Sequence, residues 1–168
     1  MEFTPQQMEE LRLGALTAID GLWFLEVESR YGFEEALEAD FEVWKRYGLV
    51  ILKRMARMLG IELDAENPPD LPTVNFLLES ISRIDGSECR GELTPQGEIH
   101  FRVHRCSWWE NLRSSGRHDL VPCERVDEVV YRHWLQALDP GLDFAITRSL
   151  PRGDAYCEWV IGRRPPSR

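Results

Sequence analysis

The 168-residue chain lacks three features that would each assign it to a distinct class of protein. It has no run approaching ~20 uninterrupted apolar residues, the length that a membrane-spanning helix needs. It has no block of Lys or Arg, and its net charge is −9, so the electrostatic footprint of a nucleic-acid-binding protein is missing. The N-terminus has neither the basic start nor the apolar core of a secretory signal. These absences predict a cytoplasmic protein whose partners include no nucleic acid and no membrane.

The composition is otherwise that of a globular protein. Hydrophobic residues make up 43% of the chain, and six Trp, seven Phe and four Tyr supply large side chains for a core. A chain of this length ordinarily forms one domain. We therefore expect a single domain over residues 1–162 and a disordered tail over residues 163–168.

The first 60 residues predict two long helices joined by a very short connection. Thr4 and Gln7 have the spacing of a capping box, so the first helix is expected to begin there. Gly32 stands where a helix would end in a left-handed residue, and a second apolar face at helical spacing follows over residues 37–59. We expect an antiparallel helical hairpin whose two helices bury each other.

The rest of the chain predicts strands and helices in separate groups. Residues 98–105 (EIHFRVHR) alternate apolar and polar side chains, which is typical of a half-buried strand. Further strands are expected over residues 88–93, 142–150 and 155–161, helices over 71–84 and 124–138, and a short helix or loop over 108–117. This order predicts an α+β fold: the helical hairpin packs on an antiparallel sheet of about four strands, with a further helix between the two β-hairpins.

The four cysteines contain no Cys-x-x-Cys pair, so the usual zinc-ribbon and redox-dithiol spacings are absent. One interpretation is that all four are simply small buried side chains. Three of them, however, fall at the ends of predicted elements, where side chains can converge: Cys106, Cys123 and Cys157. Cys123 also begins a predicted helix with Arg125 nearby, and the positive end of a helix favours thiolate. We therefore expect the pKa of Cys123 to be lowered.

These thiols also allow a metal site. Cys106, Cys123 and Cys157 together could bind zinc, which prefers tetrahedral nitrogen and sulfur ligands. His104 is two residues before Cys106, and in a strand this spacing places both side chains on one face. Zinc and the absence of any cofactor both remain open.

Polar groups on the apolar face of the first helix form a second set of candidates. Asp20 and Glu26 each lie within about 60° of Trp23 when plotted at 100° per residue. They could form structural ion pairs, or they could line a pocket with a raised pKa. We assign Asp20 as a candidate base, and Trp23, Glu26 and Trp44 as candidate ligand-binding residues, although Trp at helical spacing is also typical of a core. The acidic run over residues 34–42 is interpreted as a solvated helix face.

Several motifs along nearly the whole chain resemble those of one known family. The matching segments are Asp20-Gly21-Leu22-Trp23-Phe24 with Glu28, Gly32-Phe33-Glu34, residues 40–47 (DFEVWKRY), Cys106, Pro122-Cys123 and residues 154–159 (DAYCEW). They look like the L-2-amino-thiazoline-4-carboxylic acid hydrolase family and its uncharacterised bacterial relatives. The closing segment also resembles the end of vinyl-reductase-type small-molecule-binding domains. The resemblance implies an α+β fold and a small-molecule site between helices and sheet. It also suggests ring-opening hydrolysis of a cyclic amidine-like substrate, as one activity in the family.

Two classes of function stay open. As an enzyme, the protein would hydrolyse a C–N or C=N bond of a small cyclic acid, with Cys123 as nucleophile or metal ligand and His104 or Asp20 as general base. As a binding or sensor module, the same pocket would hold a small carboxylate or aromatic ligand without turnover, and the cysteines would bind metal or report redox state. The sequence also leaves a homodimer open.

Overall fold

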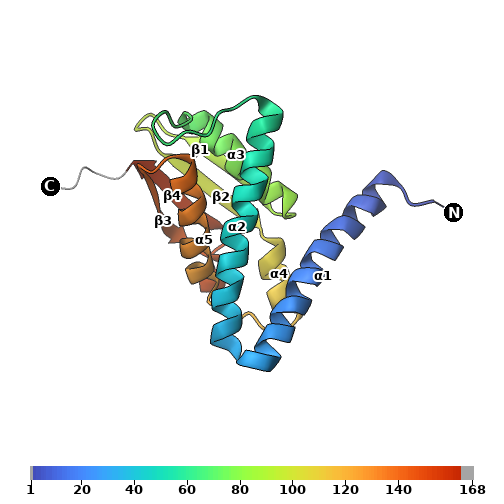
Figure 1. The fold of residues 1–168 in the computed structure, drawn as a ribbon. Helices are drawn as coiled ribbons and strands as arrows, with labels where there is room; N and C mark the ends of the chain where they lie inside the picture. The colour runs from blue at the N-terminus through green and yellow to red at the C-terminus, as the bar shows by residue number, and fades with distance from the viewer. Residues whose placement is uncertain (1, 164–168) are drawn as a thin grey trace.

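The computed structural model describes residues 2–163 and has the predicted α+β architecture (Figure 1). Its elements are α1 (Pro5–Tyr31), α2 (Phe33–Leu59), α3 (Leu71–Ile84), β1 (Glu88–Leu93), β2 (Ile99–Arg105), α4 (Ser107–Ser114), α5 (Cys123–Leu138), β3 (Leu142–Arg148), the 3-10 helix η1 (Leu150–Arg152) and β4 (Cys157–Arg163). The predicted disordered tail is corrected at its first residue, because Arg163 pairs with Leu142 of β3 and closes β4. The other residues of that tail, 164–168, lie outside the described residues.

The four strands form one antiparallel sheet in the order β1-β2-β4-β3. The second hairpin therefore joins the first through β4, and Phe101 lies opposite Trp159 with their rings stacked at 5.3 Å. Alternate residues of β2 are buried, whereas Arg102 projects from the other face and pairs with Glu158 at 2.8 Å. The sheet thus has one apolar face and one polar face, as is usual for antiparallel sheets with helices on one side.

Helices α3 and α5 contact the strands, and α2 packs against both of these helices. Helices α2 and α5 approach each other closely at Gly48, which lies against the indole of Trp134. That indole is 1% exposed, and its Nε1 donates a hydrogen bond of 3.1 Å to the carbonyl oxygen of Trp44. A Cβ atom at position 48 would lie 1.9 Å from the Trp134 ring, so the contact requires glycine.

Helix α1 departs from the predicted mutual burial. The capping box is confirmed, since Gln7 and Thr4 exchange hydrogen bonds of 3.0 and 3.2 Å. Figure 1 shows, however, that α1 and α2 meet at Gly32 and then diverge in a V, and none of the described side chains of α1 is buried. The two helices pack against each other near Gly32, where Phe24 meets Phe33 edge to face. The expected burial along their whole length is wrong, because α3 and α5 occupy the apolar face of α2. Apolar side chains such as Leu11 and Leu22 of α1 are exposed as a result.

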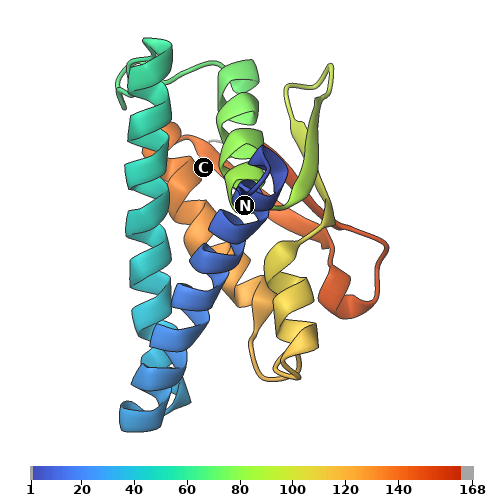
Figure 2. The same cartoon turned by 90° about the vertical axis from the view of Figure 1, so that its right-hand side faces the viewer.

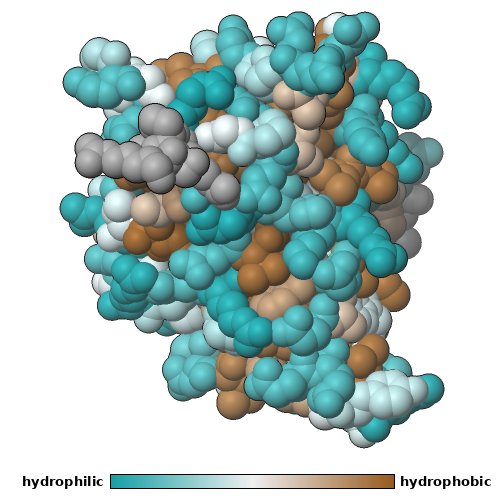
Figure 3. Space-filling view, turned by 60° about the vertical axis from the view of Figure 1, so that its left-hand side comes forward, coloured by the Kyte–Doolittle hydropathy of each residue, from teal (hydrophilic) through white to brown (hydrophobic). Residues whose placement is uncertain are grey.

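Helix α1 instead lies over the side of the molecule on which α4 lies. Figure 2 views this side, with α1 between α2 and α4. A different face, shown in Figure 3, is mostly hydrophilic, with apolar side chains in separate patches. Within residues 2–163, no helix combines the length and the apolar character needed to cross a bilayer.

Candidate functional site

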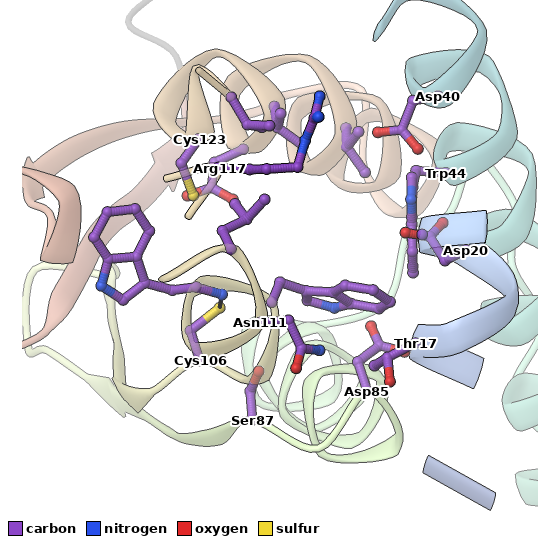
Figure 4. Close-up of a pocket in the computed structure, with 18 of the residues that line it drawn as sticks. Thr17, Asp20, Asp40, Trp44, Asp85, Ser87, Cys106, Asn111, Arg117 and Cys123 are labelled. Atoms are coloured by element: carbon purple, nitrogen blue, oxygen red, sulfur yellow. Dashed lines mark hydrogen bonds between the residues drawn. The ribbon is translucent and has the colours of Figure 1, made fainter. Parts of the chain in front are cut away.

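A cavity of about 460 Å³ lies between α1, α2, α4, α5 and the apolar face of the sheet. Figure 4 shows Cys106 and Cys123 at one end of the cavity and Asp20, Asp40 and Asp85 at the other, with Asn111 between them. We call these the thiol end and the acidic end. The cavity is also lined by aromatic side chains, namely Phe24, Trp44, Trp108, Trp109, Tyr131, Trp134 and Trp159.

The thiol end contains the three cysteines that the sequence places at element ends. Cys106 precedes α4 and caps it, because its Sγ accepts from the backbone N–H of Trp109 at 3.5 Å. Cys123 is the first residue of α5, and Cys157 is the first residue of β4. All three line the cavity and are free thiols. Three elements that are distant in sequence thus bring their ends to one place.

The thiols are not activated as the sequence suggests. Burial raises the pKa of Cys106 to about 11 and that of Cys157 to about 12, with a further contribution from the Asp127 carboxylate. The pKa of Cys123 is raised even further, by burial and then by Asp127, so the predicted lowering is wrong. Cys123 at this helix start is half-buried, and desolvation of its thiol outweighs the helix dipole. Arg125, the expected counter-charge, instead pairs with Glu38 of α2 at 2.5 Å.

The metal interpretation gains no support from the arrangement of side chains. Among the described residues, no group of three or more His, Cys, Asp or Glu side chains is arranged to hold a metal ion. Zinc at Cys106, Cys123 and Cys157 therefore stays a prediction. The fourth cysteine, Cys89, lies apart from this end of the cavity, in β1, with its thiol directed to the carbonyl oxygen of Glu79.

The acidic end brings together carboxyl groups from three elements. Asp20 comes from α1 and Asp40 from α2, while Asp85 directly follows α3. Burial raises the pKa of Asp20 to about 6, and hydrogen bonding by Trp23 and Trp44 works in the opposite direction. Burial raises the pKa of Asp40 to about 7, and the Asp20 charge adds to this shift.

Asp85 is the most buried of these three groups, at 4% exposure. Burial raises its pKa to about 7, the Tyr47 hydroxyl works against that shift, and the Asp20 charge adds to it. Tyr47 donates its hydroxyl proton to Oδ1 of Asp85 over 2.7 Å. The charge of Asp20 thus acts on both Asp40 and Asp85.

Helix α5 supplies another carboxyl group nearer the thiols. Asp127 and Tyr131 follow Cys123 at intervals of four residues, so all three share one helix face and line the cavity. Burial raises the pKa of Asp127 to about 8, with contributions from Glu124 and Glu128. A carboxyl group with this pKa is largely protonated at neutral pH and can donate a hydrogen bond to a ligand.

Arg117 is the basic residue among the described side chains that line the cavity. Its guanidinium is neutralised by Glu28 of α1, at 2.7 Å, and lies 5.8 Å from the centre of the Phe24 ring. This ion pair ties the loop after α4 to α1. The guanidinium therefore links two parts of the cavity wall, and its charge is already balanced.

Several residues proposed from the sequence lie outside the cavity. His104 is exposed on β2 with its ring 5.3 Å from that of Tyr156, so its assignment as the base is corrected. Strand β2 ends at Arg105, and the two-residue alternation that would pair His104 with Cys106 ends with it. Glu26 is also corrected as a ligand-binding residue, because its side chain is 59% exposed and pairs with Arg30.

The remaining candidates divide in the same way. Trp44 and Asp20 line the cavity. Trp23 does not, and it is corrected as a ligand-binding residue, although its proximity lowers the pKa of Asp20, against the burial that raises it. Asp20 and Glu26 lie about 60° on opposite sides of Trp23, so a helix that presents one to the cavity turns the other toward solvent.

Three carboxyl groups were missed by the sequence analysis. Asp40 belongs to the acidic run that is predicted to be solvated. However, it lies three residues after Leu37 and four before Trp44, which is the spacing of the buried face of α2. Helical spacing likewise places Asp127 on the inward face of α5, because it lies four residues after Cys123 and three before Val130. Asp85 belongs to an Asp-Gly turn, and no local pattern indicates that this turn is buried.

Comparison with known proteins gives a family match over most of the chain, but this match assigns no activity. No curated protein matches the sequence. The resemblance to the L-2-amino-thiazoline-4-carboxylic acid hydrolase family therefore stays a prediction. A family model matches residues 11–162, a range that includes the thiol and acidic ends of the cavity. The chain belongs to DUF6125, a family of unknown function.

Proposed function

We propose that the protein binds a small organic molecule in the cavity between α1, α4, α5 and the sheet. The observation that carries this proposal is the cavity itself, whose volume of about 460 Å³ falls within the range of ligand pockets, ~300–1,000 Å³. Such pockets ordinarily combine apolar walls with a few polar groups that fix the orientation of the ligand. Here the walls combine aromatic and aliphatic side chains, and the acidic and thiol ends supply polar groups.

The perturbed carboxyl groups also support a ligand site. Burying several carboxyl groups around a space is unfavourable for folding, and residues with shifted pKa values concentrate at functional sites. Asp20, Asp40, Asp85 and Asp127 all have raised pKa values and line one cavity. Their concentration is therefore better explained by a bound molecule than by the stability of the fold.

The test uses two substitutions on α1. Ala18 lines the cavity and is exposed on its other side, so Ala18→Trp should fill the space without entering the core. Ala15 is exposed on the same helix and is not among the lining residues, which makes Ala15→Trp the matched control. Ligand-observed NMR with cationic, neutral and anionic aromatic fragments would measure binding to each protein.

We expect at least one fragment class to bind the unmodified protein and the Ala15→Trp variant, and to lose binding in Ala18→Trp. Equal binding to both variants would place the fragments elsewhere and overturn the proposal. The absence of binding by every fragment class would also overturn it.

Hydrolysis of a C–N or C=N bond in a small cyclic acid is a second candidate function. It is favoured by the pKa values of Asp20 and Asp40, about 6 and about 7, because a general base works best when its pKa lies near the working pH. The raised pKa of Cys123 makes water, activated by a carboxylate, a better nucleophile than this thiol.

Incubation with 2-amino-thiazoline-4-carboxylate, followed by mass spectrometry, tests this second candidate. A product heavier than the substrate by one water molecule, lost in Asp20→Asn, would support it. Unchanged substrate after incubation with concentrated protein would reject this substrate and leave binding as the better proposal.

A further inference from the structure

The acidic end of the cavity has a specific electrostatic imbalance. Asp20, Asp40 and Asp85 line it together, and each of the latter two feels the charge of Asp20. Arg117 is the basic side chain among the described residues of the cavity wall, and it forms an ion pair with Glu28 at 2.7 Å. Three carboxyl groups therefore share a confined space without a matching cation from the cavity wall.

An unsatisfied buried atom indicates where a ligand would make contact. Asp40 is 8% exposed, and its Oδ1 has no hydrogen-bond partner within the part of the chain that the structure describes. Leaving such an acceptor unpaired typically costs about 1–3 kcal/mol. Figure 4 shows Asp40 directed toward the space beside Trp44 and Asp20. A hydrogen-bond donor on a ligand in that space would satisfy the oxygen.

Aromatic rings complete the surroundings of this space. Trp44 and Trp108 both line the cavity and meet edge to face, with ring centres 4.7 Å apart. The faces of indole rings attract cations, and the attraction is stronger where water is excluded. A group of carboxyls beside aromatic rings is therefore better suited to a cation than to a carboxylate.

We propose that the ligand is a protonated amine with an apolar body, whose ammonium group lies among Asp20, Asp40 and Asp85 beside Trp44. An ammonium group has three donors and no acceptor, which matches a site formed by carboxylate oxygens. The apolar body would extend along the aromatic wall toward Cys106 and Cys123. This inference rests on the proposed function and names its ligand class.

Binding of a cation should release protons from the protein. At neutral pH the carboxyl groups of the acidic end are partly protonated, and a bound ammonium group favours their charged forms. The affinity should therefore rise with pH over the range in which these groups ionise.

The elements around the cavity also carry other titratable or charged groups. These are Tyr47 on α2, Cys106 before α4, Arg117 after α4, Cys123, Asp127 and Tyr131 on α5, and Cys157 on β4. Asp127 is the member of this second group that could add to the pH dependence, since its pKa is raised to about 8.

The experiment compares benzylammonium, benzyl alcohol and benzoate, which have similar size and carry positive, no and negative charge. Isothermal titration calorimetry at pH 5.5 and 7.5 would measure their affinities, and buffers of different ionisation enthalpy would count the protons released. We expect benzylammonium to bind at least tenfold more tightly than benzyl alcohol at pH 7.5, to weaken at pH 5.5, and to release protons. Benzoate should bind most weakly.

Variants assign the effect to the acidic end. Asp40→Asn should weaken benzylammonium binding at least tenfold and leave benzyl alcohol binding within about twofold. Asp20→Asn should act in the same direction, and it lies on a helix with no buried side chain among its described residues, so it remains informative if Asp40→Asn fails to fold. Glu26→Gln removes an exposed carboxylate from the same helix as Asp20 and should change nothing.

The outcomes separate this inference from the proposed function. If benzyl alcohol or benzoate binds as tightly as benzylammonium and the binding is lost in Ala18→Trp, the cavity binds ligands but the ligand class is wrong. Benzylammonium binding that is unaffected by both Asp40→Asn and Asp20→Asn would also overturn the ligand class. If Ala18→Trp leaves the binding of all three compounds unchanged, the proposed function itself fails.

Discussion

The contact between Gly48 and Trp134 gives the sharpest test of the packing between α2 and α5. In Gly48→Ala the new Cβ atom would lie 1.9 Å from Cε2 and 2.1 Å from Nε1 of Trp134. Ordinary van der Waals contacts of a Cβ atom lie at 3.4–4 Å, so the ring or a helix must move. Trp134 is 1% exposed and cannot turn toward solvent.

The expected change in stability combines three effects. Alanine is favoured over glycine in a helix by about 1 kcal/mol, which would stabilise the variant. Overpacking of a core costs about 1–3 kcal/mol, and loss of the hydrogen bond from Trp134 to the Trp44 carbonyl costs about 1 kcal/mol more. The net loss is about 1–3 kcal/mol, and a loss of about 2 kcal/mol lowers Tm by roughly 4–8 °C for a chain of this size.

Thermal and urea unfolding, followed by tryptophan fluorescence, would measure this loss. Gly14→Ala is the matched control, because no described atom lies within 4 Å of a Cβ built at that position of α1. The control should be neutral or slightly stabilising. A Gly48→Ala variant as stable as the unmodified protein would refute the argument that the ring contact requires glycine there.

Three further measurements probe the cavity. Tyr47→Phe removes the 2.7 Å hydrogen bond to Asp85 and should lower the free energy of unfolding by about 1–2 kcal/mol, whereas the exposed Tyr31→Phe should leave it unchanged. The folded pKa of Asp40, about 7, lies above its ordinary value of 3.8, so the stability it contributes is fully present below pH 4 and is lost as pH rises through about 7. Tm should therefore be higher at pH 5 than at pH 8, and Asp40→Asn should reduce the difference; an equal difference in both proteins would contradict this assignment. Iodoacetamide at pH 7.5 should alkylate Cys123 much more slowly in the native than in the denatured protein, and equal rates would show that burial does not protect the thiol.

Local signals in the sequence are sufficient for most of the fold. The capping box at Thr4, the alternation of β2 and the apolar face of α5 each depend on neighbouring residues, and each element forms where its pattern predicts. The divergence of α1 from α2 does not follow from such patterns. It depends on how α3 and α5 compete for the apolar face of α2, and this competition is settled only by the packing of the whole chain.

For a related reason, sequence patterns predict only part of the candidate site. Element ends mark Cys106, Cys123 and Cys157, which do line one cavity. The direction of the pKa shift of Cys123 could not be predicted in the same way. The helix start, which lowers the pKa, is a local feature, whereas the burial that raises it depends on α1 and the sheet. Asp40 shows the same limit, since its exposed neighbours Glu38 and Glu42 have the same chemistry and only helical spacing distinguishes it.

The divergence of α1 also bears on the kinetics of ligand exchange. This helix contributes Thr17, Asp20 and Phe24 to the cavity wall, yet it has no buried side chain among its described residues. Segments with few buried contacts open locally at a lower free energy than the core, so α1 can separate from α4 while α3, α5 and the sheet remain folded. For the ligand proposed above, entry would then depend on this local opening, which the ion pair between Arg117 and Glu28 would restrain. Residence time and thermal stability can consequently be tuned by different residues of the same chain.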